Sequence, residues 1–370
     1  MRVLMLGNGF DLYHNLLSHY DDFMTICEYL IKKHSVICYD RFDGITIYSE
    51  LCNLTQINEN IKKKLLAYEE VYKKAKINKY DYTDFLTKLE SNYWFKYFLD
   101  CKNRYGWVAL ENQTDEVLSK FRKRNSRGLD IFVDAIKEEY DYRDAVDIYI
   151  KEYIFNGEKF DEFIFSEYRE FIEVLKLYLK IFVDNILPDI ANIYELCNDH
   201  FRDNDYILTF NYTDTYAKLY SSTANIIHIH GKLNNEIVLG VNSNEYDNIA
   251  NADCRFIQYK KYYQRITKHT LDDLKKMIRR VESTPATEER GLIIMGHSLD
   301  ISDEDIITVL FDFFDYIVVY YHNDAALGQY VKNLKLIFGA KELSKMTFSQ
   351  KVIFQKLPPN EYMRCCNDQL

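Results

Sequence analysis

The 370-residue chain has few residues that interrupt secondary structure, with 12 glycines and 4 prolines against usual shares of about 7% and 5%. Aromatic residues are abundant instead, with 32 Tyr and 23 Phe among them. Because glycine and proline are the residues that most often end helices, we expect mostly long helices. At about 150 residues per domain, the length fits two or three modules or one core with a large insertion.

Long apolar runs, a cysteine framework and excess positive charge are also missing. No run approaches the ~18 apolar residues that span a bilayer, and the N-terminal run is too short for a signal peptide. The eight cysteines include no C-x-x-C pair, which predicts reduced thiols, a cytoplasmic location and no structural zinc. The net charge of −10 disfavours a sequence-blind nucleic-acid binder. We expect no membrane partner.

Short apolar runs predict an open α/β core with a mostly parallel sheet. These runs are residues 3–6, 206–210, 226–230, 237–239, 292–295, 316–321 and 351–354. Nearly two hundred residues separate the first run from the second, and apolar residues at three- and four-residue spacing predict an amphipathic helix over 160–186, which Pro188 kinks or ends. We therefore predict a core of residues 1–23 and 201–356, an all-helical insertion of residues 24–200 and a tail of residues 357–370.

Polar residues follow the predicted strands, where open α/β sheets bind ligands. After the first strand, Gly7-Asn8-Gly9-Phe10-Asp11 lets backbone amides approach a phosphate, or forms a tight turn with Asp11 as the helix cap. After the second, Asn211 suits a water or a ribose hydroxyl, or caps the next helix together with Thr213 or Asp214.

The third strand ends in His228-Ile229-His230-Gly231, and strand alternation predicts both histidines on one face. His230 lies at the end of the strand, at the mouth of the expected ligand crevice. An imidazole there acts as a general base near neutral pH, and Gly231 leaves room for a ligand. We interpret His228, which lies deeper, as structural.

Taken in order, these segments resemble the AbiH family of phage abortive-infection proteins. The resemblance rests on residues 7–12, 20–23, 209–213, 229–231, 239–241 and 295–299, with Trp107 and Glu111 in the helical region. It implies antiphage defence, with a phage protein as trigger and self-assembly into a homo-oligomer as candidate interactions.

The same series resembles, more distantly, the sirtuin-like NAD-binding core. That resemblance implies a Rossmann-like sheet, Asn211 and His230 as catalytic residues, and NAD as the substrate. It also implies a nucleotide site formed by Gly7, Asn8, Gly9, Asp11, Gly240, Gly296, His297 and Ser298. Since the four-cysteine zinc module of the deacetylases is absent, NAD cleavage or binding of another adenine nucleotide is favoured over deacylation. No metal is expected.

Two other functions remain open. His228 and His230 with Asp11, His14 or Asp214 are residue types that bind zinc or manganese, as in a nuclease or phosphoesterase. Alternatively, the core binds a nucleotide for stability while the helical body senses phage.

Two basic stretches, residues 122–127 and 259–280, keep a nucleic-acid partner open. The second interleaves tyrosines with lysines and arginines, which suits a phosphate backbone. It equally fits the outer face of a packed helix.

Overall fold

The computed structural model describes residues 1–34, 51, 59–75, 77–105, 110–122, 157–194, 204–241, 254–285 and 287–357. Six strands form one sheet in the order β3-β2-β1-β4-β5-β6, and all neighbouring strands are parallel. They are β1 (Arg2–Leu6), β2 (Tyr206–Thr209), β3 (Ile226–His228), β4 (Gly291–Met295), β5 (Tyr316–Tyr321) and β6 (Val352–Lys356). The predicted α/β class with a parallel sheet is confirmed.

The predicted strand at 237–239 is wrong, because this segment is not part of the sheet. Strand β3 already ends at His228, and Gly231 adopts a φ of 75°, which turns the chain. The segment then returns beside that turn, where the amide of Val238 donates a hydrogen bond to the carbonyl of His230 at 2.8 Å. An apolar run alone does not distinguish a strand from a buried extended segment.

The described part of the long connection from β1 to β2 is built of helices. They are α1 (Asn8–Tyr13), α2 (Tyr20–His34), α4 (Glu59–Ala67), α5 (Glu69–Lys74), α6 (Lys79–Ser91), α7 (Tyr93–Tyr105), α8 (Leu110–Arg122), α11 (Gly157–Phe182), the 3₁₀ helix η2 (Asp184–Ile186) and α12 (Leu187–Tyr194). Pro188 lies in the first turn of α12, where proline is tolerated because its missing amide proton has no helical partner. The predicted domain boundary at residue 23 falls inside α2.

The remaining helices follow β2 and alternate with the later strands. They are α13 (Thr215–Leu219), η4 (Cys254–Tyr259), α14 (Lys261–Thr267), α15 (Asp272–Glu282), η5 (Ile301–Asp303), α16 (Glu304–Phe313), α17 (Asp324–Phe338) and α18 (Ala340–Phe348). Asn323 caps α17 by accepting a hydrogen bond from the amide of Ala326 at 2.8 Å, which satisfies one of the free amides at the helix start.

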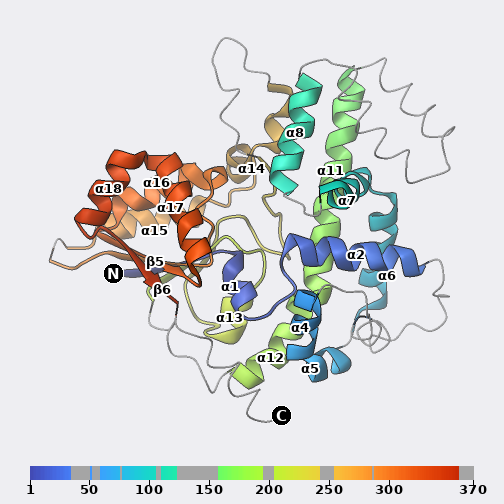
Figure 1. Cartoon of the computed structure of the whole chain (residues 1–370), viewed down its shortest axis with the longest axis horizontal. Helices are drawn as coiled ribbons and strands as arrows, with labels where there is room; N and C mark the ends of the chain where they lie inside the picture. Colours follow the sequence, from blue (N-terminus) through green and yellow to red (C-terminus); the bar gives the residue numbers. More distant parts are fainter. Residues whose placement is uncertain are drawn as a thin grey trace.

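Alternate residues of β1 enter two separate hydrophobic cores. Leu4 and Leu6 pack with the helices of the β1–β2 connection, whereas Val3 and Met5 pack with α15 to α18. Figure 1 shows these two groups of helices on opposite sides, α15 to α18 at the left and the helical body at the right. The helical body therefore shares its core with one face of the sheet.

Aromatic side chains fill much of the helical core. Trp94 is fully buried, donates from Nε1 to the carbonyl of Ile164 at 3.0 Å, and has its ring 5.1 Å from that of Tyr168. Such packing accounts for the high aromatic content.

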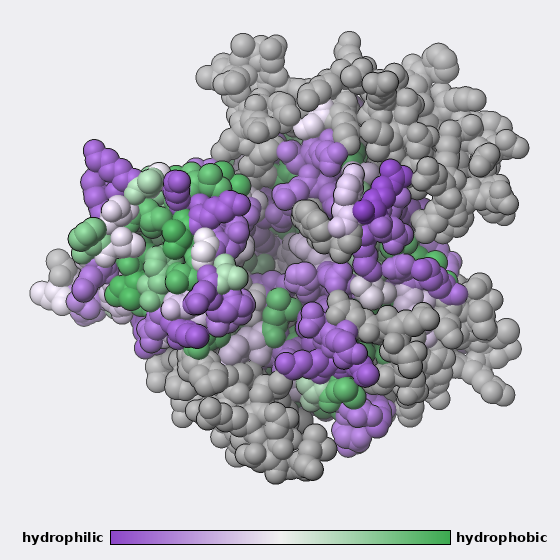
Figure 2. Space-filling view, in the orientation of Figure 1, coloured by the Kyte–Doolittle hydropathy of each residue, from purple (hydrophilic) through white to green (hydrophobic). Residues whose placement is uncertain are grey.

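Apolar side chains are also exposed, and Figure 2 shows them over α16 to α18. They include Val309, Val331, Leu336, Phe348 and, on β6, Ile353. Among the described helices, none has both the length and the apolarity to cross a membrane.

Candidate functional site

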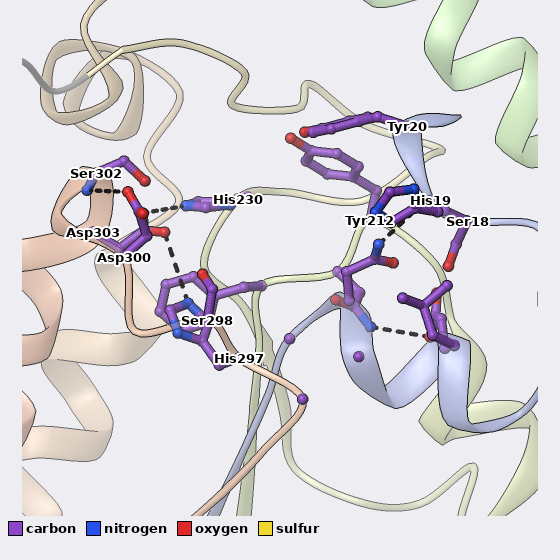
Figure 3. Close-up of a pocket in the computed structure, with 18 of the residues that line it drawn as sticks. Ser18, His19, Tyr20, Tyr212, His230, His297, Ser298, Asp300, Ser302 and Asp303 are labelled. Carbon is purple, nitrogen blue, oxygen red and sulfur yellow. Dashed lines mark hydrogen bonds and ion pairs between the residues drawn. The ribbon is translucent and has the colours of Figure 1, made fainter. Parts of the chain in front are cut away.

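A cavity of about 500 Å³ opens beyond the carboxyl ends of β1, β2 and β4. Figure 3 shows His230, Asp300 and Asp303 on one side of it and Tyr20 and Tyr212 on the other. Nine of the ten residues predicted as site residues line it, namely Gly7, Asn8, Gly9, Asp11, Asn211, His230, Gly296, His297 and Ser298.

The tenth predicted residue, Gly240, is not among the residues that line this cavity. A Cβ atom at Gly240 would lie 2.1 Å from the carbonyl oxygen of Tyr259. The next residue, Val241, forms an isolated parallel bridge with Lys260. Glycine is therefore needed at this position for a close approach of two backbones.

The glycines after β1 and β4 bring two loops into contact. The amide of Gly9 donates to the carbonyl of Gly296 at 2.8 Å, and the amide of Gly7 donates to that of Met295 at 3.1 Å. A Cβ at Gly296, whose φ is 69°, would lie 2.2 Å from the amide nitrogen of Phe10. These glycines thus serve close loop packing, and the amides of Gly7 and Gly9 already have protein acceptors.

Asn211 and Asp11 form a buried polar pair beside the cavity. The side-chain nitrogen of Asn211 donates to Asp11 Oδ1 at 3.0 Å, and the hydroxyl of Thr213 donates to Asp11 Oδ2 at 2.7 Å. Burial raises the pKa of Asp11 to about 6, although hydrogen bonds from Thr213, Thr215 and Asn211 oppose the rise. The carboxyl group is therefore mostly ionised at neutral pH.

His230 is paired with a carboxylate that sequence reasoning missed. Its Nε2 lies 3.1 Å from Oδ1 of Asp303, and both side chains are 7% exposed. Burial lowers the pKa of His230 to about 4, against the opposing effect of Asp303. The same Nε2 also lies 3.2 Å from a guanidinium nitrogen of Arg265, which can only donate, so Asp303 and Arg265 favour opposite tautomers of the neutral ring.

Two buried cations hold Asp303 ionised. Arg265 is 0% exposed and donates to Asp303 Oδ1, and Lys261 lies 3.4 Å from the same oxygen. Burial alone raises the pKa of Asp303, but Lys261 and His230 outweigh it and hold the pKa well below 3.8. Arg265 also donates to both carboxylate oxygens of Asp305, at 2.8 and 2.6 Å.

A second histidine, His297, faces Asp303 from the loop after β4. Its Nδ1 accepts a hydrogen bond from the amide of Leu299 at 3.0 Å. The neutral ring must then carry its proton on Nε2, which lies 3.7 Å from Asp303 Oδ2. The ring of Phe210 contacts His297 and His230, with centroids 4.2 and 5.1 Å away.

The helical body contributes its own residues to the cavity. Glu111 on α8 lies 2.9 Å from Lys261 Nζ, and the cavity wall also includes Tyr20 of α2 and Leu175 and Leu179 of α11. Burial raises the pKa of Glu111, although Lys261 opposes the rise. The AbiH resemblance includes Glu111 and also Trp107, which lies outside the described residues.

His228 and His230, which were predicted to share a face, have different partners. His228 Nδ1 donates to the carbonyl of Asn211 at 3.3 Å, and its Nε2 lies 3.3 Å from Asp214. His14, another proposed metal ligand, bonds to the carbonyl of Phe10 and the hydroxyl of Tyr220. Among the described residues, no group of three or more His, Cys, Asp or Glu is arranged to hold a metal.

The basic stretch 259–280 divides into two parts. Lys261 and Arg265 are buried at the site, whereas Lys275 and Lys276 lie on the exposed side of α15 and pair with Asp272 and Asp273. The chain at 123–127, most of the other basic stretch, lies outside the described residues.

Comparison with known proteins places the chain in a family. Residues 3–321 match the family model described as Bacteriophage abortive infection AbiH. No curated protein and no solved structure matches the chain. The match runs from Val3 in β1 to the end of β5 and includes the cavity residues from Gly7 to Asp303, whereas His322, Ala326, Gln329 and Tyr330 lie beyond it. The chain belongs to the AbiH family, and this membership implies a role in abortive infection, a form of defence against phage.

Proposed function

We propose that the chain cleaves NAD at the nicotinamide–ribose bond when phage infection triggers it. The observation that carries the proposal is that Asn211 and His230, which follow neighbouring strands, line the same cavity. The strand order 3-2-1-4-5-6, that of doubly wound dinucleotide-binding sheets, supports a Rossmann-like, sirtuin-like core. A cavity of about 500 Å³ lies within the range of cofactor pockets.

The lining of the cavity suits the charge that develops during this reaction. Cleavage of the bond passes through an oxocarbenium-like state, which is positively charged. Four carboxyl side chains line the cavity, namely Asp11, Glu111, Asp300 and Asp303, together with Lys261, which pairs with Glu111 and Asp303. Fixed carboxylates such as Asp11 and Asp300 stabilise such a charge.

His230 and Asn211 would divide the chemistry between them. The oxygen of a water held by Asn211 forms a bond to the anomeric carbon of the ribose, and the bond to nicotinamide breaks. The bonding electron pair leaves with nicotinamide, which becomes neutral, and the proton of the water passes to Nδ1 of His230. Asp303 acts as a positioning residue, because as an acceptor it favours the tautomer with the proton on Nε2, in which Nδ1 takes up the proton. The products are nicotinamide and ADP-ribose.

The test is to incubate the purified chain with NAD and a phage lysate and to measure nicotinamide by chromatography. Asn211→Ala and His230→Ala should each lower its release by about 10²- to 10⁴-fold. His269→Ala is the matched control, since that side chain is 79% exposed on the surface. NAD levels in infected cells are measured for the same variants, because these cells contain the trigger even if the lysate lacks it. Unchanged NAD in both experiments would overturn the proposal, and NAD binding without release would favour a sensor.

A further inference from the structure

A chain of hydrogen bonds beside the cavity runs in one direction. The hydroxyl of Thr215 donates to that of Thr213 at 3.0 Å, and Thr213 donates its own proton to Asp11 Oδ2 at 2.7 Å. The side-chain nitrogen of Asn211 donates to the other carboxylate oxygen, Asp11 Oδ1, at 3.0 Å. Both oxygens of Asp11 are therefore occupied by donors.

This arrangement determines which way the Asn211 amide points. An ionised carboxylate only accepts hydrogen bonds, so the group of Asn211 that faces Asp11 must be its NH₂ group. The side-chain carbonyl oxygen then points away from Asp11. In the described part of the chain this oxygen has no hydrogen-bond partner, while Asn211 itself lines the cavity.

The backbone of Asn211 is also held on both sides. Its backbone amide donates to the hydroxyl of Thr209 at 3.1 Å, and its backbone carbonyl accepts from Nδ1 of His228 at 3.3 Å. His228 is in turn paired with Asp214. Since main chain and side chain are both fixed, the free carbonyl oxygen has a defined position, and Asn211 lines both this cavity and a small pocket beside Thr209 and His228.

We propose that Asp11 is a positioning residue that turns the carbonyl oxygen of Asn211 toward the cavity, so that the site selects ligands presenting a hydroxyl donor there. A ribose hydroxyl or an attacking water meets this requirement, whereas an ether, a fluorine or a bare acceptor does not. The identity of the ligand rests on the proposed NAD chemistry. The orientation of Asn211 does not depend on it.

Binding calorimetry tests the selectivity with NAD and with two analogues that carry fluorine in place of the 2′- or the 3′-hydroxyl of the nicotinamide ribose. The wild-type chain should bind one analogue roughly 10- to 100-fold more weakly than NAD, because a buried acceptor would lose its donor. In Asp11→Asn the two amides can pair in either direction, so this preference should fall several-fold. Asp315→Asn, far from the cavity and partly exposed, should retain it.

A second measurement keeps the orientation testable if Asp11→Asn does not fold. In a wild-type chain with ¹⁵N-labelled asparagine, the side-chain NH₂ protons of Asn211, assigned with Asn211→Ser, should be protected from exchange with water. Rapidly exchanging NH₂ protons, or equal binding of NAD and both analogues, would overturn the inference. Protected protons in a chain that does not bind NAD would support the orientation while the proposed function fails.

Discussion

The amide of Gly9 and the carbonyl of Gly296 are joined by a hydrogen bond of 2.8 Å. This bond ties the loop after β1 to the loop after β4, two strands that are neighbours in the sheet but almost three hundred residues apart in the chain. The cavity therefore depends on a contact that leaves no room for a side chain.

We expect Gly296→Ala to destabilise the fold by about 1–3 kcal/mol and to abolish ligand binding. The new Cβ would meet the backbone of Phe10, and the φ of 69° disfavours any residue other than glycine. Gly328→Ala is the control, because Gly328 lies in helix α17 with open space around it. That variant should gain about 0.5–1 kcal/mol. Denaturant unfolding of both variants measures the difference, and equal stabilities would contradict this account of the loops.

Asp303→Asn should cost about 3–5 kcal/mol of unfolding free energy, because Lys261 and Arg265 would remain as buried charges without their shared carboxylate. Asp315→Asn offers a comparison, since Asp315 forms an ion pair of 2.6 Å with Arg290 at the surface. That loss should cost at most about 1 kcal/mol. A similar cost for the two variants would mean that Asp303 is not the anchor of the buried network.

The fold was largely predictable from short-range patterns, whereas the buried network of Asp303 with His230, Lys261 and Arg265 was not. Apolar runs identified all six strands because a parallel sheet buries both faces. The segment 237–239 has the same pattern, and only the turn at Gly231 decides that it leaves the sheet.

Asn211 and His230 could be found because they follow strands directly. Arg265 could not, since it lies in a basic stretch that resembles a surface helix. Its partners Asp303 and Asp305 are 38 and 40 residues away. Such contacts arise from tertiary packing, which no local pattern records.

The raised pKa of Asp11 predicts a pH dependence of stability. In the unfolded chain the pKa is near 3.8, and in the folded chain burial raises it to about 6. The folded state therefore binds the proton more tightly, and the stability from this group, present below pH 3.8, is lost as the pH rises through 6. A difference of about two pKa units corresponds to roughly 3 kcal/mol.

Asp11→Asn removes this titration, so the variant should gain stability relative to wild type at pH 7.5 but not at pH 4. Denaturant unfolding of the two proteins at both pH values measures the gain. Taking the difference between them cancels the titration of other groups, such as His14. A gain that is the same at both pH values would show that the carboxyl group is not under strain when ionised.

The last prediction concerns control of the site by the helical body. This prediction rests on the proposed NAD cleavage, which would kill the host if it ran unchecked and therefore requires an inactive resting state. Glu111 on α8 contacts Lys261 at 2.9 Å beside the cavity. A change in α8 packing can thus reach Asp303 and His230 through one side chain. We expect Glu111→Gln to weaken this contact and to arrest growth without phage, while Glu116→Gln, exposed on the same helix, leaves growth normal. Growth curves and NAD levels in uninfected cells provide the measurement. Normal growth with full protection, or lost protection without toxicity, would show that Glu111 does not hold the resting state.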